Sequence, residues 1–205
     1  MDGLNLAVLY SYGCDMGRVT GIDRNFLDFF KNPDSSEQKR KEIVSLLEGL
    51  NPYESYCSLA DLMKCQDVFE EQVVRAYWLG NGQIRKDLNH NFQVLTKILA
   101  MRIKRKLPVR AVNKMLDCLV SCGRILRVRP GRITILHHGL LCDRRGDYVW
   151  RKEKREIESG FVKNPERGNL VSIHNFSARE KINRGQIRLL RETTLQAMKT
   201  TAGPK

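Results

Sequence analysis

The stretch CLVSCGRILRVRPGRITIL, residues 118–136, carries the clearest fold signal in the sequence. Pro130-Gly131 is a typical turn, and Arg132-Ile133-Thr134-Ile135 after it alternates polar and apolar residues strictly. Before the turn, the segment from Arg124 to Arg129 interleaves apolar residues with three arginines. Short runs of this kind on both sides of a tight turn predict a β-hairpin over residues 124–136.

Two further strands are expected downstream, at Tyr148 to Trp150 and at Leu170 to Ile173, each preceded by a turn that contains glycine. Because a few short strands cannot close a large sheet, a small β-barrel is the most economical arrangement. A helix over about Arg184 to Lys199 follows the last strand, with Asn183 as its N-cap. The sequence therefore predicts a small barrel with a terminal helix over residues 116–199.

The first hundred residues show a helical rather than a strand-like pattern. Apolar residues recur at intervals of three and four in three stretches, Ile43–Leu50, Phe69–Tyr77 and Phe92–Ile103. A charge run and a proline at Lys104 to Pro108 mark the change of pattern, so we place the domain boundary there. The fold class expected is α+β, with a helical domain over 1–107, the barrel with its helix over 116–199, and a frayed tail over 200–205.

The net charge of +13 is distributed very unevenly along the 205 residues. Residues 1–100 carry 11 Lys and Arg against 14 Asp and Glu, whereas residues 101–205 carry 25 against 9. An asymmetry of this size favours an anionic partner for the second half, either a nucleic acid or an acidic protein surface. A solvated basic face without a partner is the alternative.

Hydropathy and cysteine usage indicate the cellular compartment. No window approaches the roughly 18 uninterrupted apolar residues of a membrane span, and the apolar run from Leu4 to Tyr10 lacks the basic flank of a signal peptide. Six cysteines are scattered over the chain rather than concentrated in a small secreted scaffold, so disulfides are not expected. We therefore expect a soluble cytoplasmic protein with no membrane partner.

Cys118 opens the strand-rich half, and His174 stands at the end of its last predicted strand. If the first and last strands pair antiparallel to close the barrel, these two residues become neighbours. A thiolate and an imidazole together form a ligand pair for a soft or borderline metal, and Arg124 and Arg127 would favour the thiolate. Taken singly, each residue has a structural reading, as a small buried hydrophobe or a hydrogen-bonded histidine.

Two motifs in this half carry a resemblance to a known family. Cys118-Leu119 is followed at a fixed offset by Gly123-Arg124-Ile125, and Val171-Ser172-Ile173-His174 precedes the helix over 184–199. In this order and spacing, residues 118–199 resemble the HypC/HupF-type hydrogenase formation chaperones. That family has a short OB-like barrel that opens with Met-Cys-Leu-x-x-Pro-Gly-Arg-Ile/Val and a last strand that reads Val-x-Val-His before a C-terminal helix.

The resemblance implies a carrier role in the assembly of NiFe hydrogenase. In the chaperones, the motif cysteine binds the iron of an Fe(CN)2CO unit together with a scaffold maturation protein, and the unit is delivered to the hydrogenase large subunit precursor. By position, Cys118 would be the iron ligand and His174 the assisting histidine. Cys122 stands where the family motif has proline, and it is a further candidate ligand only as a second nearby thiol. The whole chain also resembles an uncharacterised prokaryotic family with a Val-Val-x-Ala-Tyr-Trp-x-Gly-Asn stretch, here Val73 to Asn81, before such a module.

A nucleic-acid-binding barrel without metal chemistry is the alternative to a maturation chaperone. Small OB-type barrels with basic surfaces bind single strands by phosphate contacts and aromatic stacking, and the candidate residues for this function are Arg127, Arg129, Arg132 and Trp150. His137, His138 and Cys142 form a further cluster whose spacing matches no zinc pattern. No paired-carboxylate, Ser/His/Asp or nucleophile-elbow arrangement can be read, so no catalytic residue is predicted and we do not expect an enzyme.

Overall fold

The computed structural model describes residues 2–12, 29, 36–82 and 86–202. The chain divides into two compact units, Met1–Asn89 and His90–Lys205. The first unit is helical, and the second combines helices with a five-stranded sheet, so the fold class is α+β as predicted. Within the described residues, no helix is both long enough and apolar enough to cross a membrane.

The described part of the first unit consists of helices around an aromatic core. Its elements are α1 (Gly3–Ser11), α3 (Glu37–Glu48), α4 (Pro52–Met63), α5 (Glu71–Leu79) and the 3-10 turn η1 (Lys86–Leu88). Trp78 is fully buried, stacks on Tyr10 and donates a hydrogen bond to the hydroxyl of Tyr56. Ser36 caps α3 by accepting a hydrogen bond from the backbone N–H of Lys39. The other residues of the predicted break before this helix, 32–35, lie outside the described residues.

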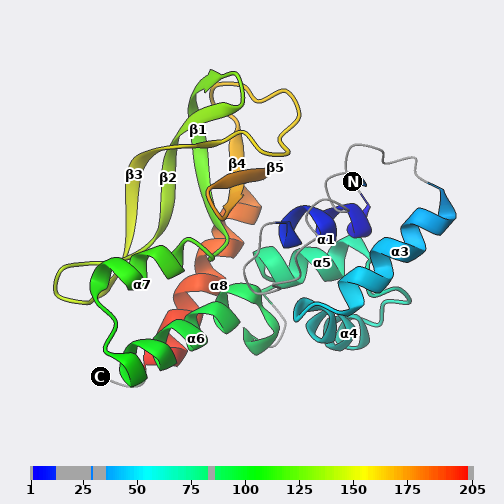
Figure 1. Ribbon diagram of the computed structural model, residues 1–205, viewed down its shortest axis with the longest axis horizontal. Helices are drawn as coiled ribbons and strands as arrows, with labels where there is room; N and C mark the ends of the chain where they lie inside the picture. The colour runs from blue at the N-terminus through cyan, green and yellow to red at the C-terminus, as the bar shows by residue number, and fades with distance from the viewer. Residues whose placement is uncertain (1, 13–28, 30–35, 83–85, 203–205) are drawn as a thin grey trace. The chain divides into compact units, whose positions relative to one another are not determined.

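The second unit contains two helices, five consecutive strands and a terminal helix (Figure 1). Its elements are α6 (His90–Arg105), α7 (Val109–Leu116), β1 (Ser121–Arg129), β2 (Arg132–Cys142), β3 (Tyr148–Glu158), β4 (Leu170–His174), β5 (Ser177–Lys181) and α8 (Arg184–Ala202). The strands pair in the order β1-β2-β3-β5-β4, and β4 pairs again with β1, so the sheet closes on itself. All pairings are antiparallel except the one between β3 and β5, which is parallel.

The predicted hairpin is confirmed. β1 and β2 pair from Cys122↔His138 to Arg129↔Arg132 around the Pro130-Gly131 turn. Ile125, Ile133 and Ile135 lie in one buried cluster inside the closed sheet. Because side chains alternate along a strand, residues one position away from these point to the outer face.

Helices α6, α7 and α8 form a second core beside the sheet. α6 packs against α8 and α7, and α7 packs against β2. The shared cluster includes Val94, Ile98, Val112, Leu116, Leu140 and Ala197. Since α6 contributes to this core, the compact unit begins at residue 90 rather than after the expected boundary at 107.

Three other sequence expectations can be compared with the structure. The strand predicted at 148–150 is longer and runs to Glu158, and the one at 170–173 is present as β4. Asn183 caps α8 by accepting a hydrogen bond from the N–H of Gln186, and the helix continues to Ala202. Residues 203–205 of the expected frayed tail lie outside the described residues. β5 was not predicted, because Ser177-Ala178-Arg179-Glu180-Lys181 has no apolar alternation.

Candidate functional site

The pairing of β1 with β4 brings the two halves of the family-like motif to one end of the sheet. The register pairs Ser121 with Ile173, so the chain just before β1 runs beside His174 at the end of β4. The backbone N–H of Asn175 donates a hydrogen bond of 3.2 Å to the carbonyl of Asp117. Cys118 and His174 therefore belong to neighbouring segments, as antiparallel closure predicts.

His90, at the start of α6, lies between these two segments. Its Nε2 is 2.9 Å from the carbonyl oxygen of Cys118, and its ring meets that of His174 edge to face with centroids 5.1 Å apart. His90 is 1% exposed and His174 is fully buried. Burial lowers the pKa of His90 to about 4, so the ring is neutral at pH 7. Nε2 then donates the proton to the Cys118 carbonyl, because a carbonyl oxygen only accepts.

Sequence reasoning missed His90 because it stands 28 residues before Cys118 and within the segment assigned to the helical domain. Its neighbour Asn91 has a similar role. The Asn91 side chain donates to the carbonyl of Val120 and accepts from the N–H of Val120, both at 2.8 Å. The same amide nitrogen also donates to Thr194 Oγ1 in α8. The start of α6 thus fixes the segment that carries Cys118.

Cys118 is a half-buried cysteine between α7 and β1. Its side chain packs against the apolar cluster formed by α6, α7 and α8. Within the described residues, no three or more His, Cys, Asp or Glu side chains are grouped so as to hold a metal ion.

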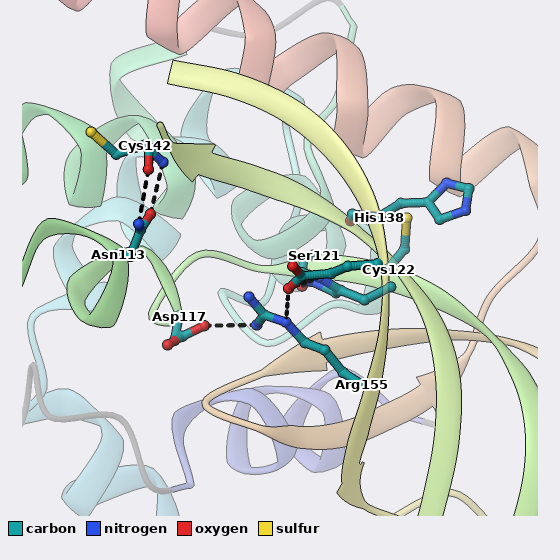
Figure 2. A network of polar contacts seen from close by, with 9 residues as sticks. Asn113, Asp117, Ser121, Cys122, His138, Cys142 and Arg155 are labelled. Carbon is teal, nitrogen blue, oxygen red and sulfur yellow. Dashed lines mark hydrogen bonds and ion pairs between the residues drawn. The ribbon is translucent and has the colours of Figure 1, made fainter. Parts of the chain in front are cut away.

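Cys122 and His138 lie on the other face of the sheet from the isoleucine cluster. They are direct cross-strand partners, and Figure 2 shows the thiol and the imidazole on the same side. Burial raises the pKa of Cys122 to about 12, although Arg191 of α8 acts in the opposite direction. The thiol is therefore protonated at pH 7.

The residues proposed for nucleic-acid binding are placed at separate positions. Arg129 and Arg132 are exposed at the β1–β2 turn and both contact Glu156, at 3.7 and 3.3 Å. Arg127 is exposed on the outer side of β1, after a register irregularity. Trp150 pairs with Leu140 and packs against the helical cluster, so it lies apart from the three arginines.

A polar network inside the sheet joins five residues from β1, β2, β3 and the segment just before β1. Arg155 donates a 2.9 Å hydrogen bond to Asp117 and a second hydrogen bond to Glu153 (Figure 2). His137 Nε2 is 2.9 Å from Ser121 Oγ, and His137 Nδ1 is 3.8 Å from Glu153 Oε1. Burial raises the pKa of Asp117, and the contact with Arg155 counteracts this. Asp117, Ser121, His137 and Arg155 line a cavity of about 20 Å³, roughly the space of one water molecule.

The sequence did not reveal this hydroxyl–imidazole–carboxylate set, because the three residues lie on three different strands. Burial, followed by the charge of Arg155, lowers the pKa of His137 to about 3. A general base works best with a pKa near the working pH, so this imidazole is a weak one. Arg155 also occupies the carboxylate of Glu153. The network therefore fits a structural role in holding Asp117 and the start of β1.

His137, His138 and Cys142, which form one group in the sequence, do not form one in the structure. His137 points into the sheet and His138 away from it, as alternation along β2 requires. Cys142 ends the strand, where its backbone exchanges two hydrogen bonds with the side chain of Asn113 in α7 (Figure 2). Burial raises the pKa of the Cys142 thiol.

Comparison of the chain with protein-family models, with curated proteins and with solved structures gave no match.

Proposed function

We propose that the chain is an accessory protein of the hydrogenase-maturation type, which binds a protein client at the end of the closed sheet where Cys118 and His174 lie. The observation that carries the proposal is the β1–β4 pairing, which places the segments of both family-like motifs side by side. His90 reinforces this arrangement by contacting both. Such a role needs no catalytic residue.

The strand order supports an OB-type fold for this unit. An OB-fold is a five-stranded barrel that is partly open. Here β3 and β5 are joined through Glu158↔Ser177 alone, whereas β1, β2 and β3 pair along most of their lengths. The weakest closure is therefore between β3 and β5, and the β4–β5 turn lies next to the segment of Cys118.

The cargo that we propose is an iron precursor unit, held jointly with a scaffold protein. Cys118 supplies one thiol, and the hydrogen bond from His90 to its carbonyl holds the backbone in position. His174 is fully buried, so we assign it a positioning role beside His90 rather than direct ligation. One thiol from this chain and further ligands from a partner match the transfer function that the resemblance implies.

Co-purification with a hydrogenase large subunit precursor and its scaffold protein tests the proposal. The full chain is expressed with both, and iron content and client binding are measured. Cys118→Ala should remove iron and weaken client binding. Cys122→Ala is the matched control, because this thiol lies on the outer face of the sheet and its pKa is raised to about 12.

Equal iron content in the wild type and the Cys118→Ala variant would contradict the iron part of the proposal. Client binding could survive Cys118→Ala but disappear when Phe176 in the β4–β5 turn is changed. That result would support a protein-binding role that does not involve a metal. Phe176 is 52% exposed at that turn and is suited to a protein contact. Absence of client binding in the wild-type chain would refute the function as a whole.

A further inference from the structure

The outer face of β1, β2 and β3 carries a cluster of positive charge that the proposed function does not use. Cys122, His138 and Lys152 form one cross-strand row. The charged groups that act on the His138 imidazole are Lys152 of β3, Arg124 of β1 and Arg191 of α8. Two strands and one helix thus place cationic side chains near the same histidine.

The cluster continues along the strands. Arg124, Leu136 and Lys154 form the next row on the same face, about 7 Å away for two residues of strand. Lys154 also lines a shallow groove beyond this row, together with Arg127 and Arg129. The basic face therefore extends over three rows, which is longer than a single phosphate group.

No acidic side chain neutralises the positive charge at the centre of this face in the described part of the chain. In the described part of the chain, none of Arg124, Lys152 and Arg191 forms an ion pair with an acidic side chain. Glu156 in the third row is engaged by Arg129 and Arg132. Like charges held close together oppose folding, so an uncompensated cluster of this kind is typical of a site for an anionic ligand.

We propose that the outer face of β1, β2 and β3, with Arg191 of α8, binds the phosphate backbone of single-stranded nucleic acid. The cations are spaced along a track, which fits successive phosphates better than one phosphate ion. Between them, Leu136 and His138 are half-buried and present an apolar contact and an imidazole ring to the bases. The face of strands 2 and 3 is also the face that OB-type barrels use for oligonucleotides.

This site differs from the nucleic-acid site that the sequence suggested. Arg129 and Arg132 are partly neutralised by Glu156, and Trp150 packs against helices. Arg124, Lys152 and Arg191 become neighbours only through cross-strand pairing and the packing of α8 on β1. The proposal is independent of any protein client or metal.

The test uses the full chain and a fluorescently labelled single-stranded oligonucleotide of about 16 nucleotides, the upper site size of one OB-type barrel. Binding is measured by anisotropy between about 50 and 200 mM salt. In a variant with Arg124, Lys152 and Arg191 all changed to Glu, affinity should fall at least tenfold. Replacing the same residues by Gln should reduce the salt slope by about 2, since each single-strand phosphate contact contributes roughly 0.7.

The matched control changes Lys163, Arg167 and Lys181 to Glu, which alters the net charge by the same amount at exposed positions of the same unit. Near wild-type affinity in this control supports the proposed face. Equal loss of affinity in both triple variants would show that only total charge matters and would overturn the proposal. Thermal melts of all variants establish that the compared proteins are folded.

Two competitors distinguish nucleic acid from other anions. Polyglutamate that displaces the oligonucleotide as well as unlabelled oligonucleotide would indicate an acidic protein ligand, and the proposal would fail. Inorganic phosphate that binds through the same three cations, with an oligonucleotide no tighter than phosphate, would identify a site for free phosphate and would also overturn it. Displacement by unlabelled oligonucleotide alone is the expected result.

Discussion

His90 shows how one buried side chain couples the candidate site to protein stability. It hydrogen-bonds the Cys118 carbonyl and packs against His174, while burial lowers its pKa to about 4. The neutral ring can donate only one proton, and the carbonyl receives it. Protonation of the second nitrogen would place a positive charge on a buried ring that packs against His174.

This pKa predicts a loss of stability in mild acid. A histidine with a folded pKa near 4 and an unfolded value near 6.5 binds its proton mainly in the unfolded state between these values. The contribution of neutral His90 to the free energy of unfolding should then be fully present above pH 6.5. It should fall by about 3 kcal/mol as the pH drops towards 4. Urea denaturation across this range should show that His90→Gln flattens the curve. The curve of the half-buried His138→Gln control should stay close to wild type, and equal flattening would contradict the assignment.

Asn91 illustrates a different residue-scale effect, the use of a side-chain amide in place of a neighbouring strand. Its amide exchanges two hydrogen bonds with Val120 and donates a third to Thr194. Asn113 exchanges a similar pair with Cys142 but is only half-buried. Both residues attach a helix to the strand-forming chain.

Asn91→Leu keeps the branched shape of the side chain but leaves the buried N–H and carbonyl of Val120 without their partners. We expect the unfolding free energy to drop by about 3 kcal/mol or more, because each unsatisfied buried group costs about 1–3 kcal/mol. Asn113→Leu should cost less, since water reaches that site more easily. Chemical denaturation of both variants measures the difference, and an equal loss would refute the role of burial.

At the scale of elements, the loop between β3 and β4 is held close against β5. Gly160 has φ +57°, and a Cβ at this position would stand 2.1 Å from the carbonyl oxygen of Ala178. The N–H of Phe161 donates a hydrogen bond to the same oxygen. This contact reinforces the junction between β3 and β5, which Glu158↔Ser177 alone pairs.

Gly160→Ala should therefore destabilise the closed sheet by more than the usual cost of a side chain at positive φ. Gly131 is the matched control, because it has φ +71° and a Cβ added there would meet no atom within 4 Å. Gly131→Ala should cost only about 1–2 kcal/mol of backbone strain. Thermal melting compares the two variants. Similar melting temperatures would show that the loop can shift to accommodate the added methyl group without loss of stability.

For the whole molecule, the position of α6 decides which piece of the chain forms a complete core. α6 packs against α8 and supplies both His90 and Asn91 to the segment of Cys118. A fragment of residues 90–205 should fold cooperatively. A fragment of residues 108–205, which starts after the boundary expected from sequence, should lose the cluster around Val94 and Ile98.

Circular dichroism and thermal melting of the two fragments test this prediction. The longer fragment should melt in a single sharp transition, and the shorter one should show a broad transition or none, because a core without α6 leaves buried apolar surface exposed. A sharp transition at the same temperature for both fragments would contradict the assignment of α6 to this unit.

Local patterns determined much of the architecture. The Pro130-Gly131 turn and its alternating flanks predicted the hairpin, and the apolar repeats predicted helices, because these signals act over a few residues. The neighbourhood of Cys118 and His174 followed from assuming antiparallel closure. β5 was not predicted because its polar residues, including the buried Arg179, form their hydrogen bonds only in the folded protein.

Tertiary structure alone decided which distant residues meet. His90 reaches Cys118 across 28 positions, and Ser121 meets His137 across 16, although no sequence spacing signals either contact. The separation of His137 from His138 follows from strand alternation once the register is known. Cross-strand pairing and the packing of α8 likewise assembled the cations around His138. Contacts of this kind depend on the register and packing of the complete fold, which local propensity does not encode.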